Sequence, residues 1–156
     1  EEEIAARLMT TVLGGTPHAK LFLQVREALS LCYYCSARYY AMKGFMLVES
    51  GVETRNIERA KQEILAQLEE IQKGNVTEEE LVSAKLSLCN SYRTVEDYLS
   101  GMESWYLLQT FRKTSQTPEE AVQQIQKVTK EQVIAAANRV TLDTTYRLVG
   151  SEEEQR

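Results

Sequence analysis

Histidine is almost absent from this sequence, since His18 is the single example among 156 residues. A catalytic zinc site takes three protein ligands, and the H-E-x-x-H and H-x-x-E-H motifs that supply two of them do not occur. A Ser-His-Asp arrangement would have to use His18, and no nucleophile elbow marks a serine for it. We therefore expect His18 to be a surface or capping residue, and we expect no metal, cofactor or catalytic residue in this chain.

Blocks of basic residues and long apolar runs are also missing. The net charge is −5 with no Lys/Arg cluster, so neither nucleic acid nor an acidic membrane surface is an expected partner. No apolar run approaches the roughly 18 residues that span a bilayer. The sequence starts with Glu-Glu-Glu rather than Met or a basic signal peptide, so we expect a processed or excised piece of a cytoplasmic protein.

Cysteine is scarce too, with Cys32, Cys35 and Cys89 in apolar surroundings. An odd number of such cysteines suits reduced, buried thiols in a cytoplasm. Cys32 and Cys35 have C-x-x-C spacing, but positions i and i+3 of a regular strand point to opposite faces. Buried thiols are therefore favoured over a zinc or redox site. Gly14-Gly15 belongs to no phosphate-binding motif.

Helical spacing of apolar residues covers most of the sequence. Gly14-Gly15 is expected to cap the first helix. Three threonines are expected to begin helices through capping boxes. The helix at 98–111 is expected to be largely buried. The predicted helices are 2–13, 16–29 opening at Thr16-Pro17, 56–73, 77–97, 98–111, and two that follow Thr117 and Thr129.

Strand signals are fewer. Residues 31–42 and 45–50 flank a Lys43-Gly44 turn and predict an antiparallel hairpin, and alternation over 144–150 predicts a last strand. The fold class is therefore α+β, with an antiparallel sheet (hairpin plus a C-terminal strand) covered by several helices. Residues 1–156 form a single expected domain, whose sheet is thin for so many helices.

Arg26 is the residue with the most informative position. It falls near the end of the second helix, and Tyr33 falls near the start of the next strand. Arg26 could lie along the surface or pair with Glu27. Alternatively, a short connection could bring the tips of Arg26 and Tyr33 to one rim, where both can donate hydrogen bonds to the carbonyls of an extended peptide.

Four short motifs carry a family resemblance, which covers about residues 4–150. Their order and spacing resemble the opening of the second, non-catalytic domain of insulinase-like (pitrilysin-type) zinc metallopeptidases, and details are similar to a small bacterial cytoplasmic branch rich in non-peptidase homologues. The matching segments are Leu13-Gly14-Gly15, Lys20-Leu21-Phe22, Val25-Arg26-Glu27 and Leu31-x-Tyr33.

The resemblance implies two homologous halves that close like a clamshell. The first half holds zinc through H-x-x-E-H and a distal Glu, and the second contributes an Arg-x6-Tyr segment, here Arg26 and Tyr33, to bind the substrate backbone. Ser30 and Ala19 stand where active members usually have Gly and Ser.

For this chain, the resemblance implies a partial C-terminal domain of a larger two-domain protein, lacking its first strands and inactive alone. Its function would be the substrate-binding or scaffolding half of a zinc metallopeptidase. The implied partners are the zinc-holding N-terminal half, a polypeptide substrate, and another chain in a homodimer or heterodimer, since an exposed sheet edge recruits strands. The alternative is a non-peptidase interaction subunit of a degenerate pair.

Overall fold

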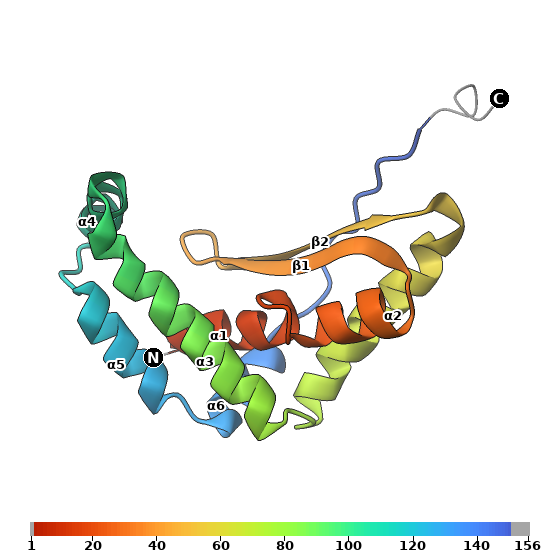
Figure 1. Cartoon of the computed structure of the whole chain (residues 1–156), viewed down its shortest axis with the longest axis horizontal. Helices are drawn as coiled ribbons and strands as arrows, with labels where there is room; N and C mark the ends of the chain where they lie inside the picture. Colours follow the sequence, from red (N-terminus) through yellow and green to blue (C-terminus); the bar gives the residue numbers. More distant parts are fainter. Residues whose placement is uncertain (1, 151–156) are drawn as a thin grey trace.

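The computed structural model describes residues 2–150, and its α+β architecture confirms the predicted class. Figure 1 shows a hairpin lying over a layer of helices, with a second helical group at one end. The elements are α1 (Glu2–Gly14), the π-helix η1 (Leu21–Ala28), β1 (Cys32–Tyr40), β2 (Phe45–Val52), the 3-10 helix η2 (Thr54–Asn56), α2 (Ile57–Gln72), α3 (Glu78–Arg93), the 3-10 helix η3 (Thr94–Asp97), α4 (Leu99–Arg112), α5 (Pro118–Lys127) and α6 (Lys130–Ala137). Within this part of the chain, no helix is both long enough and apolar enough to cross a membrane.

The hairpin forms as the sequence predicts. β1 and β2 pair antiparallel, and the register ends at Tyr40 opposite Phe45, whose rings stack with centroids 4.9 Å apart. Gly44 closes the turn with a φ of 67°, a conformation that glycine adopts without steric cost.

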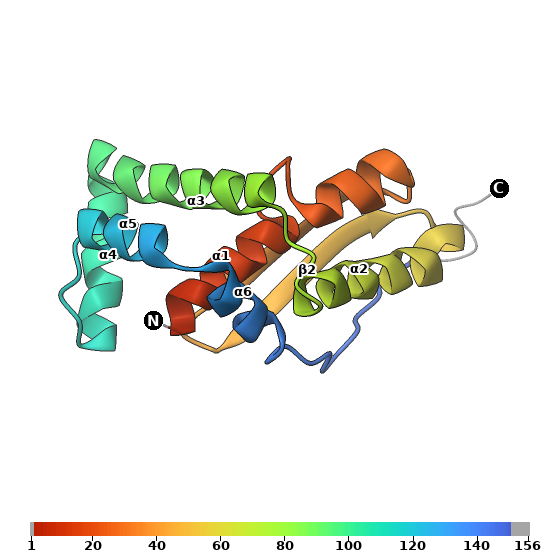
Figure 2. The same cartoon turned by 90° about the horizontal axis from the view of Figure 1, so that it is seen from below.

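The core lies between the hairpin and the helices beneath it. One face of β1 packs on α1, while η1, α2 and α6 close the other sides, as Figures 1 and 2 show from two directions. Most of the largest fully buried side chains come from these helices, among them Leu8, Met9, Leu13, Leu21 and Ile71.

α1 ends at Gly14, as predicted, but for a different reason. A glycine cap normally uses a positive φ, and among the described glycines only Gly44 and Gly74 have one. Gly14 instead lies against β1, where a Cβ would come within 2.8 Å of the Ala37 backbone nitrogen. Its missing side chain allows the helix to approach the strand.

All three threonine capping boxes are confirmed. Thr77, Thr117 and Thr129 each accept a hydrogen bond from the backbone three residues on, and the side chain there accepts one in return. These pairs satisfy backbone N–H groups that a helix leaves free at its start. They fix the beginnings of α3, α5 and α6.

The expectation that residues 98–111 form a largely buried helix is wrong on burial. α4 does form, but it crosses the ends of α3 and α5 and attaches through a narrow face (Figure 2). Trp105 donates to the Gln116 carbonyl at 2.8 Å and meets Tyr92 edge-on. Leu99 and Phe111 are 86% and 67% exposed. Bulky apolar residues occupy nearly the whole circumference of this helix, and the described part of the chain covers only one side of it.

The predicted last strand at 144–150 is not formed. These residues run without regular secondary structure, and Arg147 makes an ion pair with Glu58 at the start of α2. Within residues 2–150 the sheet has only β1 and β2. Alternation determines which side chains share a face of a strand, whereas a strand also needs a neighbouring backbone for its hydrogen bonds.

Candidate peptide-binding site

Arg26 lies in the last turn of η1, which begins at Leu21 rather than at Thr16-Pro17 as predicted. Residues 15–19 form turns. The apolar spacing therefore predicted the helix correctly, but Pro17 does not begin it. Leu21 and Val25 are fully buried and anchor η1 to the core, which leaves the Arg26 side chain 41% exposed on the other side.

The Arg26 guanidinium has two neighbours on its own helix. Its central carbon lies 4.6 Å from the centroid of the Phe22 ring, and its Nη1 lies 3.4 Å from Glu27 Oε1. The pairing with Glu27 that the sequence left open is therefore present. An exposed ion pair of this kind contributes little to the stability of the fold. Its effect is to orient the arginine side chain.

Ser30 ends the helix in a left-handed conformation, with a φ of 49°. Its N–H donates to the Arg26 carbonyl at 3.1 Å, and the next N–H, of Leu31, donates to the Val25 carbonyl at 3.0 Å. This nested pair of bonds is a helix C-cap in which glycine is usual. The left-handed backbone at this position therefore suits glycine better than serine.

Ser30→Gly is expected to raise the free energy of unfolding by about 0.5–1 kcal/mol, because a non-glycine residue pays about 1–2 kcal/mol in the left-handed region. Urea denaturation measures the change. Ser87→Gly, at an exposed position in the interior of α3, is the matched control and should destabilise instead. Equal losses in both variants would contradict the argument.

Tyr33 is turned to solvent by a β-bulge. The register runs from Cys32 opposite Val52 to Tyr34 opposite Gly51, so β1 has one extra residue there. Cys35 points inward and is buried; regular alternation would therefore have pointed Tyr33 inward as well. Instead Tyr33 is 72% exposed. Bulges that re-aim a side chain are frequent next to functional sites.

Arg26, in the last turn of η1, and Tyr33, the second residue of β1, are on either side of a short connection, residues 29–31, and both are accessible. Within residues 2–150 no hydrogen bond or ion pair joins the two side chains. Tyr33 also borders a hollow of about 130 Å³. The hollow is lined by Ser30, Leu31, Cys32, Tyr33, Glu53, Arg55 and Asn56.

The same bulge overturns the expectation that Cys32 and Cys35 point to opposite faces. Cys32 packs against the core and is a close enough neighbour to influence the ionisation of Cys35, because the extra residue shifts the alternation by one. Burial raises the pKa of the Cys35 thiol to about 12, although the Ser50 hydroxyl acts in the opposite direction. Cys35 is therefore a protonated, unreactive thiol at neutral pH.

Iodoacetamide at pH 8 is expected to alkylate the partly exposed Cys32 before Cys35, as peptide mapping by mass spectrometry can measure. The pKa of Cys35 is higher in the folded state than in the unfolded state, so the thiol of the unfolded chain ionises at lower pH. The free energy of unfolding therefore declines as the pH rises from about 9 toward 12. Cys35 should thus become reactive only at high pH or on unfolding. Equal alkylation rates at pH 8 would refute this assignment.

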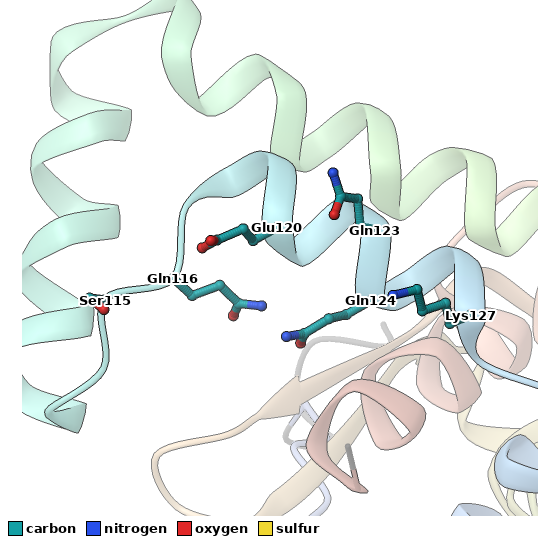
Figure 3. Close-up of a pocket in the computed structure, with 6 residues that line it drawn as sticks. All are labelled: Ser115, Gln116, Glu120, Gln123, Gln124 and Lys127. Carbon is teal, nitrogen blue, oxygen red and sulfur yellow. The ribbon is translucent and has the colours of Figure 1, made fainter.

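A larger hollow, of about 360 Å³, lies beside α5 and is polar (Figure 3). The Gln116 amide points into it toward Gln124, and Gln116 Nε2 is buried with no hydrogen-bond partner among the described residues. Glu120, at the rim, is occupied by its capping box. The hollow contains no nucleophile paired with a base, so its chemistry does not indicate catalysis. Its lining is Ser115, Gln116, Glu120, Gln123, Gln124 and Lys127.

The donor set does not fit zinc in the part of the chain that the structure describes. No three His, Cys, Asp or Glu side chains come together there, and a zinc site needs at least three such ligands. The two candidate residues, Arg26 and Tyr33, carry a guanidinium and a phenol, which are hydrogen-bond donors.

Comparison with known proteins identifies the family of this chain. Residues 1–88 match the family model described as the peptidase M16 inactive domain. The chain belongs to this family. The chain is also 33% identical, over 148 residues, to the "Probable inactive metalloprotease YmfF" of Bacillus subtilis (strain 168). That alignment covers 95% of the chain and 35% of the relative.

Two solved structures share the architecture of this M16 inactive domain. A conserved protein from Enterococcus faecalis superposes with a TM-score of 0.82 at 32% identity, over 89% of the chain and 33% of that protein. A protease from Helicobacter pylori gives a TM-score of 0.79 at 18% identity, over 88% and 34%, and supports the fold alone. The chain spans about a third of the length of these relatives.

Three features of the inactive domain escaped prediction from sequence. The bulge at Tyr33 leaves no composition signal, since Leu, Cys and Tyr suit a regular strand equally well. The Phe22 contact could have been found from its spacing of four residues from Arg26. The third is a nearly buried ion pair between Lys20 and Glu80, which joins η1 to α3; it depends on long-range packing and has no local signal.

Proposed function

We propose that this chain is the substrate-binding, non-catalytic half of an insulinase-like zinc metallopeptidase. In this proposal Arg26 and Tyr33 donate hydrogen bonds to the backbone of a polypeptide, close to a zinc site held by a separate N-terminal half. The observation that carries it is the bulge that turns Tyr33 outward beside the connection from Arg26. Membership of the M16 inactive-domain family supports the same reading.

The alternative is a non-peptidase interaction subunit of a degenerate pair. It is favoured by the relative whose own name describes it as a probable inactive metalloprotease. In that case Arg26 and Tyr33 would support packing between the two halves. The presence or absence of H-x-x-E-H in the N-terminal half of the longer protein separates the two readings, because this motif supplies the zinc ligands.

Peptide binding by this chain tests the proposal directly. The probe is a fluorescein-labelled extended peptide without acidic residues, followed by anisotropy. Arg26→Ala and Tyr33→Phe should each weaken binding, the arginine change by about tenfold or more, because hydrogen bonds from charged donors contribute about 1.5–3 kcal/mol. Arg93→Ala on α3 and Tyr146→Phe near the C-terminus are matched controls on exposed residues and should bind normally.

If the longer protein has an H-x-x-E-H motif, Arg26→Ala should slow its cleavage of peptides by a similar factor. Unchanged binding and unchanged turnover in Arg26→Ala would exclude the substrate-binding role. Peptide binding that Arg26→Ala leaves unchanged, but that is lost when the N-terminal half is removed, would favour the interaction subunit.

We also propose that the chain associates with a second chain, as a homodimer or heterodimer or with the N-terminal half. The hairpin has free edges in the described sheet, and α4 exposes bulky apolar residues, two features that partner surfaces cover. Light scattering should detect association of the isolated chain. Leu107→Glu with Phe111→Glu should reduce it if α4 contributes, and a monodisperse wild-type monomer would count against self-association.

A further inference from the structure

We infer that Phe22 and Glu27 set the position and ligand preference of Arg26, so that the site selects neutral peptide carbonyls over carboxylates. Phe22 is a positioning residue and Glu27 determines specificity. The inference rests on the proposed function, because it concerns what Arg26 binds. It adds a ligand class: extended polypeptide segments without acidic side chains at the contact.

The ring of Phe22 fixes one face of the guanidinium. Phe22 precedes Arg26 by four residues on η1, and the distance of 4.6 Å from the guanidinium carbon to the ring centroid is within cation–π range. An arginine side chain otherwise samples many rotamers, and that freedom must be lost when it binds a ligand. The ring therefore lowers the entropic cost of donating a bond in one direction.

Glu27 forms an ion pair with one nitrogen of the guanidinium. Nη1 lies 3.4 Å from Glu27 Oε1, and both side chains remain partly exposed, at 41% for Arg26 and 56% for Glu27. A guanidinium has five N–H donors in a planar fork. In the described part of the chain, no hydrogen bond or ion pair engages Nε or Nη2 of Arg26, so this edge is available to a ligand.

The charge of Glu27 then decides between ligands. A lone arginine binds carboxylates well, because it can donate two parallel bonds to two charged oxygens. Here a carboxylate ligand at the free edge would lie near the charge of Glu27 and be repelled, whereas a neutral peptide carbonyl would not. The pair therefore presents a directed donor with little net charge, which suits a backbone more than an acidic side chain.

Two matched peptides test the preference, one neutral and one with a single glutamate at its centre, each labelled with fluorescein. Wild type should bind the neutral peptide more tightly. Glu27→Gln should shift the ratio of the two affinities by about fivefold toward the acidic peptide, because only the acidic peptide carries charge that Glu27 repels. Glu49→Gln, on the exposed face of β2, is the control for a general change of charge.

Phe22→Leu should weaken binding of both peptides by a similar factor, on the order of two- to fivefold. Phe22→Trp keeps an aromatic ring beside Arg26 and should bind both peptides about as tightly as wild type. NMR gives a readout that needs no peptide: the Arg26 Nε–H proton should show a ring-current shift in wild type that is lost in Phe22→Leu and present in Phe22→Trp. A merely structural role for Phe22 would not produce this pattern.

The two proposals fail in different ways. If Arg26→Ala weakens binding but Glu27→Gln leaves the ratio of the two affinities unchanged, or if wild type lacks the ring-current shift, the inference is overturned and the proposed function stands. If wild type binds neither peptide, or Arg26→Ala binds both normally, the proposed function fails and the inference fails with it.

Discussion

Glu80→Ala is expected to lower the free energy of unfolding by about 3 kcal/mol, because this carboxylate has two partners. Its Oε1 lies 2.9 Å from Lys20 Nζ, in a pair whose side chains are only 10% and 14% exposed. Its Oε2 accepts the Thr77 N–H at 2.9 Å and completes the cap of α3. Removing Glu80 leaves a nearly buried ammonium unpaired and a helix start incomplete.

Glu120→Ala separates these two contributions. Glu120 completes the same capping box at the start of α5 but is exposed and has no lysine partner among the ion pairs of the described residues. Its removal should therefore cost only about 1 kcal/mol, the value of a cap. Urea denaturation of both variants gives the comparison.

Lys20→Met should be less harmful than Glu80→Ala, since the carboxylate remains hydrogen-bonded at the start of α3. A double-mutant cycle of Lys20→Met with Glu80→Gln measures the coupling between the two residues. Equal losses in Glu80→Ala and Glu120→Ala would show that the ion pair contributes nothing.

Gly14→Ala is expected to lower the free energy of unfolding by about 2 kcal/mol, with Gly14→Val costing more. A Cβ at Gly14 would lie 2.8 Å from the Ala37 backbone nitrogen and 2.9 Å from Leu21 Cδ1, both in the packed core. Either α1 or β1 would have to move. Helix propensity alone predicts the opposite sign, because alanine in a helix is favoured over glycine by about 1 kcal/mol.

Gly44→Ala is the control for Gly14→Ala. Nothing lies within 4 Å of a Cβ at Gly44, so the cost there is limited to its φ of 67° and should be about 1 kcal/mol. Thermal and urea denaturation of the two variants measure the difference. A stabilised Gly14→Ala would mean that the close approach of α1 to β1 is absent in solution.

The sequence proposes residues for the candidate site but does not give their geometry. Arg26 and Tyr33 are proposed because they match the Arg-x6-Tyr segment of the family that the sequence resembles. The exposure of Tyr33 depends on an extra residue in β1, and the orientation of Arg26 depends on its contacts with Phe22 and Glu27. The roles of both residues in binding remain predictions.

Features that depend on neighbours in sequence were determined by the sequence itself: the hairpin turn at Gly44 and the three threonine caps follow from local backbone geometry and hydrogen bonding. The tertiary structure decided the rest. Residues 144–150 have a strand pattern but no paired backbone, and α4 is apolar but largely uncovered, because pairing and burial require a second surface. Gly14 is the clearest case: the sequence ends a helix there, and only the packing of α1 on Ala37 explains why the residue has no side chain.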